Sequence, residues 1–182
     1  AIASALAALG ASVILVTGPS TMPSPPNVKL IKVQTGREMY KAVLDELPAD
    51  VAVFVAAVGD WYVGEVAEQK IKKNNGGPPS LKFKENPDIL HEVSNLREKR
   101  PSLVIGFAAE TSDLIKNAEI KLNKKNCDWI IANDVSTATG IMGGDQNKIS
   151  LISEKQKEDW PLMSKTSVAT KLAAKICESL GV

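Results

Sequence analysis

The segment 51–60 combines an apolar strand with a polar residue at its end, a pattern that could hold a ligand. Residues 51–58 form a continuous apolar run, as expected for a buried parallel strand. Ligands of open α/β sheets bind outside the carboxyl ends of such strands. Small residues at this end, Ala56, Ala57 and Gly59, would let a flat ligand approach the backbone. Asp60 could then accept hydrogen bonds from that ligand.

A lysine cluster follows soon after this acid, at Lys70, Lys72 and Lys73. Each ammonium group is a compact cation that can hold phosphate oxygens, so three of them suit a polyphosphate. The alternative is a solvated, charged loop without a ligand. With Asp60, the cluster predicts a site for a nucleoside triphosphate.

The run Asn86, Pro87, Asp88 and Ile89 is typical of a helix start. Asn suits the N-cap, Pro the first helical position and an acid the first turn. Capping alone explains these residues. The functional alternative is that the free N–H groups of this helix face the same ligand crevice.

Three more side chains are candidates for the same crevice. Phe107 ends a second apolar strand, where its ring could stack on a base or belong to the core. Lys121 and Lys125 lie four residues apart, so they share one face of a predicted helix. These lysines could close a cationic ring around the phosphates or only solvate the surface.

The composition excludes several other classes of protein. A formal net charge of +1 argues against a nucleic-acid binder held by bulk charge. The chain has no apolar stretch of the ~20 residues that span a bilayer, and it has no visible signal peptide. The lone His91 excludes a multi-histidine metal site, and the cysteines, Cys127 and Cys177, lack metal-ligand spacing. We therefore expect a cytoplasmic protein with reduced cysteines and no nucleic-acid or membrane partner.

Local patterns predict several individual elements. Ser12–Val16 reads as a strand. Thr35 predicts the N-cap of a helix that begins at Gly36, and Ser164 predicts the N-cap of the last helix. Lys148–Ile152 reads as a strand that pairs back near 159–161.

Strand and helix patterns alternate along the whole chain, which predicts one α/β domain, residues 1–182. We expect a Rossmann-like, mainly parallel sheet with helices on both faces, and a small antiparallel element around 148–161 near the C-terminus. The Gly- and Pro-rich stretch 62–85 predicts a flexible, lysine-rich lid. Residues 1–9 read as a helix with neither a cap nor a preceding strand, so we expect an upstream segment.

Five motifs, in this order, closely resemble phosphopantothenoylcysteine synthetase, the ligase domain of the bacterial coenzyme A biosynthetic flavoprotein family. The resemblance covers nearly the whole chain. The motifs are Ala56-Ala57-Val58-Gly59-Asp60, Lys70-Ile71-Lys72-Lys73, Asn86-Pro87-Asp88-Ile89-Leu90, Gly106-Phe107-Ala108-Ala109-Glu110-Thr111 and Ala132-Asn133-Asp134-Val135. Gly59 and Trp61 stand where the family usually has Ala and Tyr.

The resemblance implies a CTP-dependent ligase. CTP would activate 4′-phosphopantothenate as an acyl-cytidylate and release pyrophosphate, and the amine of L-cysteine would then displace CMP. Such a step depends on positioning and on neutralising charge at the phosphates. The resemblance also implies Mg²⁺ with the CTP, and a homodimer formed through the region around 148–161.

The family's functional residues carry over to matching positions of this chain. Lys70 would be the catalytic residue, closing over the triphosphate, and Ala57 would contact the activated intermediate. The residues implied in nucleotide binding are Ala56, Asp60, Lys70, Asn86, Pro87, Asp88, Ile89, Phe107, Lys121 and Lys125. The metal ligands stay unassigned.

The family begins with a strand and a glycine-rich loop that we expect upstream of Ala1. Many bacterial relatives also carry an upstream flavin-dependent decarboxylase domain, so FMN is expected only if such a domain is fused to or assembled with this one. Two other functions remain open. One is an NAD(P)-dependent reductase on a doubly wound fold, although the chain has no G-x-G-x-x-G after a strand and no P-loop. The other is a nucleotide-binding protein without catalytic activity.

Overall fold

The computed structural model describes residues 1–65, 80–110, 112–135 and 144–182. The lysine cluster at 70–73 and most of the predicted lid lie outside these residues. The helices are α1 (Ile2–Ala8), α2 (Gly36–Asp45), α3 (Ile89–Ser94), α4 (Leu114–Lys125) and α5 (Lys165–Leu180). The strands are β1 (Val13–Thr17), β2 (Val28–Lys32), β3 (Val51–Phe54), β4 (Trp61–Val63), β5 (Phe83–Glu85), β6 (Leu103–Glu110), β7 (Trp129–Asp134), β8 (Gln146–Asn147), β9 (Ile149–Ser153), β10 (Lys157–Asp159) and β11 (Met163–Ser164).

A five-stranded mixed sheet in the order β10-β9-β7-β6-β3 forms the centre of the molecule. β3, β6 and β7 run parallel, as predicted. β9 runs antiparallel to both of its neighbours, β7 and β10, so the central sheet is mixed where we expected it to be mainly parallel. Only residues 154–156 separate β9 from β10, and a connection this short permits a hairpin but no parallel crossover. The antiparallel element predicted at 148–161 therefore exists, as an extension of the central sheet.

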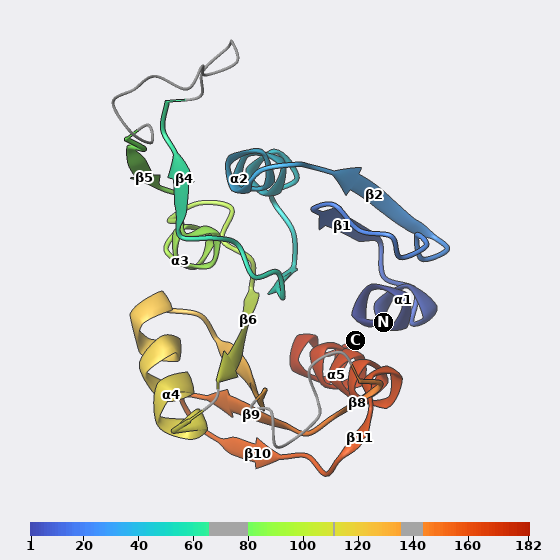
Figure 1. The fold of residues 1–182 in the computed structure, drawn as a ribbon. Helices are drawn as coiled ribbons and strands as arrows, with labels where there is room; N and C mark the ends of the chain where they lie inside the picture. Colours follow the sequence, from blue (N-terminus) through green and yellow to red (C-terminus); the bar gives the residue numbers. More distant parts are fainter. Residues whose placement is uncertain (66–79, 111, 136–143) are drawn as a thin grey trace.

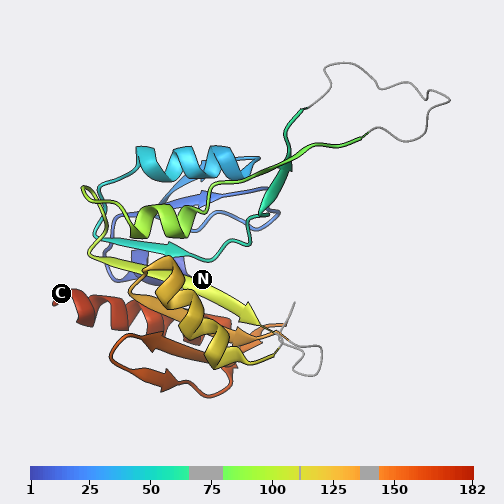
Figure 2. The same cartoon turned by 90° about the vertical axis from the view of Figure 1, so that its left-hand side faces the viewer.

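Three two-stranded sheets surround this centre. β1 and β2 are parallel, whereas β4 pairs with β5, and β8 with β11, in antiparallel ladders. The sequence analysis did not predict β4, β8 or β11, each of which is two or three residues long. Figure 2 shows the β4–β5 ribbon, in teal and green, extending away from the body of the molecule.

Helices cover both faces of the central sheet, as predicted. α3 and α4 lie on one face and α5 on the other, where α1 packs against it (Figure 1). The alternation along β6 serves two core clusters: Val104 and Ala108 pack on the α4 side, and Leu103 and Ile105 on the α5 side. The buried core is thus concentrated around β6, β7 and β9.

The helix starts confirm some predicted caps and correct one. Thr35 accepts the Glu38 N–H at the start of α2, and Ser164 accepts the Ser167 N–H at the start of α5, as predicted. Asn86, however, is not the cap of α3; that cap is Asp88, whose side chain accepts the His91 N–H. The chain at Asn86 still follows β5 in an extended ladder, so the helix can begin only after Pro87.

In the part of the chain that the structure describes, no helix is both long enough and apolar enough to cross a membrane.

Candidate nucleotide site

The segment after β3 is an exposed loop held in place by Asn86. β3 ends at Phe54, earlier than the predicted 51–58, and Ala56, Ala57 and Asp60 are all exposed. The Asn86 side-chain Nδ2 donates to the Gly59 carbonyl oxygen (2.8 Å), and the Asn86 backbone N–H donates to the Asp60 carbonyl oxygen (2.8 Å). The structure therefore joins two of the predicted site segments, 56–60 and 86–89.

The start of α2 lies against this junction. A Cβ placed on Gly36 would come within 2.8 Å of Val58 Cγ1 and 3.4 Å of the Asn86 amide. The absence of a side chain at position 36 thus lets the first turn of α2 lie directly on the loop. Sequence reasoning noted Gly36 only as the first residue of a helix.

The start of α3 is tied to α4 through Asp88 and Lys125. One oxygen of Asp88 caps α3, and the other forms an ion pair with the Lys125 ammonium group. Partial burial would raise the pKa of Asp88, but hydrogen bonds from Lys125 and the His91 N–H, together with the charge of Lys125, lower it below its usual value. Asp88 is therefore a carboxylate at neutral pH. Lys125, predicted to face phosphates, has an acidic partner in this structure.

α3 rests directly on β6, which fixes its depth relative to the sheet. Ile89 and Leu90 are buried, and a Cβ on Gly106 would come within 2.6 Å of a Leu90 methyl carbon and 2.9 Å of Ile130 Cδ1. Only glycine fits this contact without moving its neighbours. The Ile89 side chain belongs to the core, and its backbone N–H is the part that could face a ligand.

Lys121 and Phe107 meet through the backbone of Phe107. The Lys121 Nζ donates to the Phe107 carbonyl oxygen (2.8 Å) from α4. The half-buried ring of Phe107 packs with the core cluster on the α5 side of the sheet. The aromatic ring and the two lysines of α4 therefore do not share one face of the sheet, which the sequence pattern could not reveal.

The structure also bears on two other kinds of chemistry, attack by a cysteine thiol and binding of a metal ion by side chains. Burial raises the pKa of Cys127 to about 11, so its thiol is protonated at neutral pH and unsuited to nucleophilic attack. In the described part of the chain, no group of three or more His, Cys, Asp or Glu side chains could hold a metal ion. Lys70, the predicted catalytic residue, lies outside the described residues.

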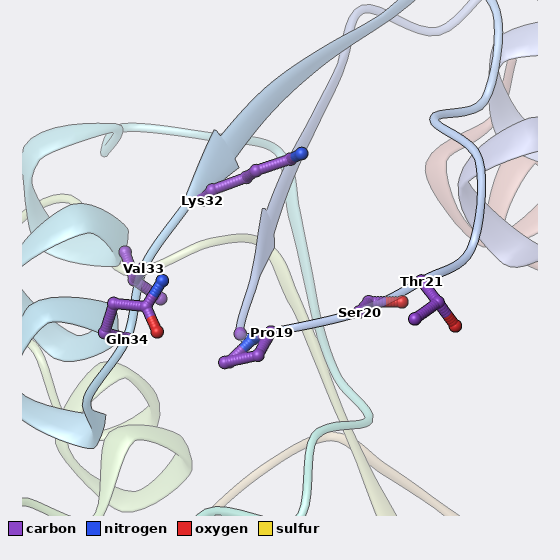
Figure 3. Close-up of a pocket in the computed structure, with 7 residues that line it drawn as sticks. Pro19, Ser20, Thr21, Lys32, Val33 and Gln34 are labelled. Atoms are coloured by element: carbon purple, nitrogen blue, oxygen red, sulfur yellow. The ribbon is translucent and has the colours of Figure 1, made fainter.

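Sequence reasoning missed a hollow at the carboxyl ends of β1 and β2. It has a volume of about 610 Å³ and is lined by Gly18–Thr21, Lys32, Val33 and Gln34. Figure 3 shows Lys32 at the end of β2 and Val33 and Gln34 just after it, across from Pro19, Ser20 and Thr21. The same rule that pointed to Asp60 would have found this hollow, because Gly18 and Pro19 come one residue after the strand predicted at Ser12–Val16.

Together, the fold and the position of the 56–60 loop after a parallel strand define an α/β domain with a candidate ligand site at its sheet edge. The model of the family described as "DNA/pantothenate metabolism flavoprotein C-terminal domain" matches residues 1–180, and the chain belongs to this family. The resemblance to phosphopantothenoylcysteine synthetase drawn from the motifs is confirmed.

Relatives of this chain are named as coenzyme A biosynthesis proteins. The chain is 41% identical over 182 residues to the coenzyme A biosynthesis bifunctional protein CoaBC of Vibrio cholerae, covering 99% of this chain and 45% of that protein. It is 41% identical over 179 residues to CoaBC of Haemophilus influenzae, covering 98% and 44%. The chain thus spans less than half the length of these relatives.

Solved structures agree on the fold. The crystal structure of the C-terminal domain of CoaBC matches with a TM-score of 0.80 and 29% identity, over 99% of this chain and 80% of that chain. A Cab2 mutant in complex with phosphopantothenate-cysteine matches with a TM-score of 0.58 and 15% identity, over 84% of this chain and 53% of that chain. At this identity the second match supports the fold alone.

Proposed function

We propose that this domain joins 4′-phosphopantothenate to L-cysteine in coenzyme A biosynthesis, using CTP. The carboxylate of phosphopantothenate attacks the α-phosphorus of CTP, and pyrophosphate leaves. The cysteine amine then attacks the resulting acyl-cytidylate, so that the new amide bond forms as CMP departs and the amine proton is lost. The observation that carries this proposal is the family match over residues 1–180.

The described residues suggest how the nucleotide would be held. The exposed loop with Ala56 and Asp60 would accept the sugar or base, and residues 86–89, where the chain enters α3, would line the pocket. Ala57, next on the same loop, would contact the acyl-cytidylate. Lys70 would cover the triphosphate and offset the charge that develops on it.

Lys121, Lys125 and Phe107 take a modified role in this proposal. Each lysine already has a protein partner, the Phe107 carbonyl oxygen for Lys121 and Asp88 for Lys125. An ammonium group has three N–H donors, so each can still offer hydrogen bonds and charge to phosphates. Phe107 would meet the cytosine at the exposed end of β6.

Mg²⁺ would enter with the triphosphate. Mg²⁺ commonly keeps several waters and binds through substrate phosphates and one or two carboxylates, which suits a site with the exposed Asp60 rather than a cage of protein ligands. Bound in this way, the ion would offset negative charge on the phosphates.

The family resemblance also motivates three proposals about assembly in the cytoplasm. A strand upstream of α1, with its glycine-rich loop, would complete the sheet; within the described residues β1 pairs only with β2, and β3 only with β6. The domain would form a homodimer through the region around 148–161. The bifunctional relatives suggest fusion to, or assembly with, a decarboxylase that carries FMN.

The test is turnover by the full-length protein with CTP, 4′-phosphopantothenate and L-cysteine. We expect pyrophosphate and CMP to appear together with 4′-phosphopantothenoylcysteine. Lys70→Gln should abolish product while leaving the melting temperature unchanged, and Lys99→Gln, at an exposed position in the connection between α3 and β6, is the matched control. A wild-type protein that binds CTP but releases no pyrophosphate would contradict the proposal.

A further inference from the structure

The side chain of Asn86 does not cap a helix, because the N-cap of α3 is Asp88. It instead reaches back across 27 positions to the loop after β3, where Nδ2 donates to the Gly59 carbonyl oxygen at 2.8 Å. The two residues next to each other in this loop, Gly59 and Asp60, therefore both have their carbonyl oxygens bound to Asn86.

The backbone explains why a side chain is used here. β4 and β5 pair with Trp61 opposite Glu85, and the Asn86 N–H bond to Asp60 extends this pairing by one step. Pro87 has no N–H and cannot extend the ladder further. The Asn86 amide supplies the donor that reaches the next carbonyl along the loop.

The packing around the amide fixes its position. Gly36 of α2 approaches so closely that a Cβ there would lie 3.4 Å from both Cγ and Oδ1 of Asn86. The amide is thus confined between the start of α2 and the loop. One side chain joins the start of α2, the loop after β3 and the approach to α3.

We propose that Asn86 is a positioning residue, which fixes the backbone of Gly59 and Asp60 so that the Asp60 carboxylate is presented to the nucleotide. The Asn86 side chain then acts on ligand affinity through the loop rather than through a contact of its own with the ligand. This inference rests on the proposed CTP site, but the clamp itself can be tested without any ligand.

The first experiment follows amide hydrogen exchange in the nucleotide-free, full-length protein. In Asn86→Ala we expect exchange over residues 55–65 and 83–86 to accelerate ~10-fold, the scale of one lost hydrogen bond. Asn123→Ala, an exposed asparagine on α4, is the matched control and should leave this exchange unchanged. Unchanged exchange in Asn86→Ala would overturn the clamp.

The second experiment is a double-mutant cycle on CTP affinity, measured by titration calorimetry. We expect Asn86→Ala to weaken CTP binding ~10-fold. In an Asp60→Asn background the same substitution should cost less than ~2-fold, because the loop then has no carboxylate to present. Equal losses in both backgrounds would mean that Asn86 contacts the nucleotide independently and would overturn the inference.

Asn86→Asp covers the case in which the alanine variant does not fold. It keeps the size of the side chain and the backbone N–H but loses the donor to Gly59, so it should weaken CTP binding at least as much as alanine does. Wild-type affinity in Asn86→Asp would overturn the inference. A wild-type protein that binds no CTP would overturn the proposed function, while the exchange experiment would still decide whether the clamp exists.

Discussion

The two halves of this domain differ sharply in how they are buried. Before Ile89, Val33 is the only hydrophobic residue in the described part of the chain that is buried, and α1 and α2 have no buried residue. From Ile89 onward, β6, β7, β9 and α5 bury two complete clusters, and α5 alone buries five side chains. The candidate site lies where the halves meet, with the 56–60 loop from the first half and Phe107 and Lys121 from the second.

This difference suggests a division of labour. The second half has the packing of a rigid support, because its strands are covered on both faces. The first half depends on local hydrogen bonds, caps and single contacts such as Asn86 to Gly59, and regions of that kind open with little free energy. Binding of a ligand at this site would therefore order the first half of the domain and leave the second half unchanged.

The largest expected effect comes from a cavity in the second half. Ile131 lies fully buried in β7, and Ile131→Ala should reduce the free energy of unfolding by about 2–5 kcal/mol. Ile14→Ala, in the half-exposed β1, removes the same atoms at a position that is 38% exposed and should cost about 1 kcal/mol. Chemical unfolding of the purified protein measures both. Equal losses of unfolding free energy in the two variants would contradict the difference in packing between the halves.

The second prediction compares two glycines. Gly106→Ala forces Leu90 and Ile130 to move within a packed core, so we expect a loss of about 1–3 kcal/mol and a shift of α3. Gly59→Ala meets only the Trp61 carbonyl oxygen, at 3.8 Å, and should leave stability nearly unchanged. Thermal unfolding of the two variants checks this, and a Gly59→Ala variant that is the less stable of the two would contradict it.

The third prediction compares the N-caps of α2 and α5, one helix from each half of the domain. Thr35→Ala and Ser164→Ala each remove one side-chain acceptor from a helix start, which costs about 1 kcal/mol at the helix itself. Since α2 buries no side chain, its loss should appear as local opening, seen as faster amide exchange in α2 alone. In Ser164→Ala the loss should lower global stability, because α5 carries core residues; exchange that stays local to α5 would contradict this.

The sequence alone revealed the parts of the fold that are set locally. Thr35 and Ser164 were predicted as caps because each is followed by a helix-forming pattern, and the hairpin near 148–161 was predicted from the strand pattern of 148–152 and a return near 159. The direction of β9 in the sheet was not predicted, because a strand pattern does not specify its neighbours.

The contacts between residues of the candidate site could not be predicted from the sequence either. Asn86 and Asp88 both suit an N-cap, and only the β4–β5 pairing decides that Asp88 has that role. Lys121 donates to the Phe107 carbonyl oxygen, and Lys125 forms an ion pair with Asp88. Both contacts join segments that are far apart in the chain. Residue type and spacing placed these residues near one another but could not assign their partners.

The smallest effect concerns the link between α3 and α4, and it depends on pH. The pKa of Asp88 is lowered in the folded protein, so its pairing with Lys125 stabilises the fold above the pKa of the unfolded chain and is lost as pH falls through the folded-state pKa. Asp88→Asn keeps a good cap but loses the charge, and should cost at most about 1 kcal/mol near neutral pH, since Asp88 is 44% exposed. Wild type and variant should converge in stability only when pH has fallen below the lowered folded-state pKa of Asp88. Asp45→Asn, in the more exposed pair with Lys41, should show a smaller gap, and a gap at Asp88 that persists into acid would show that charge is not its cause.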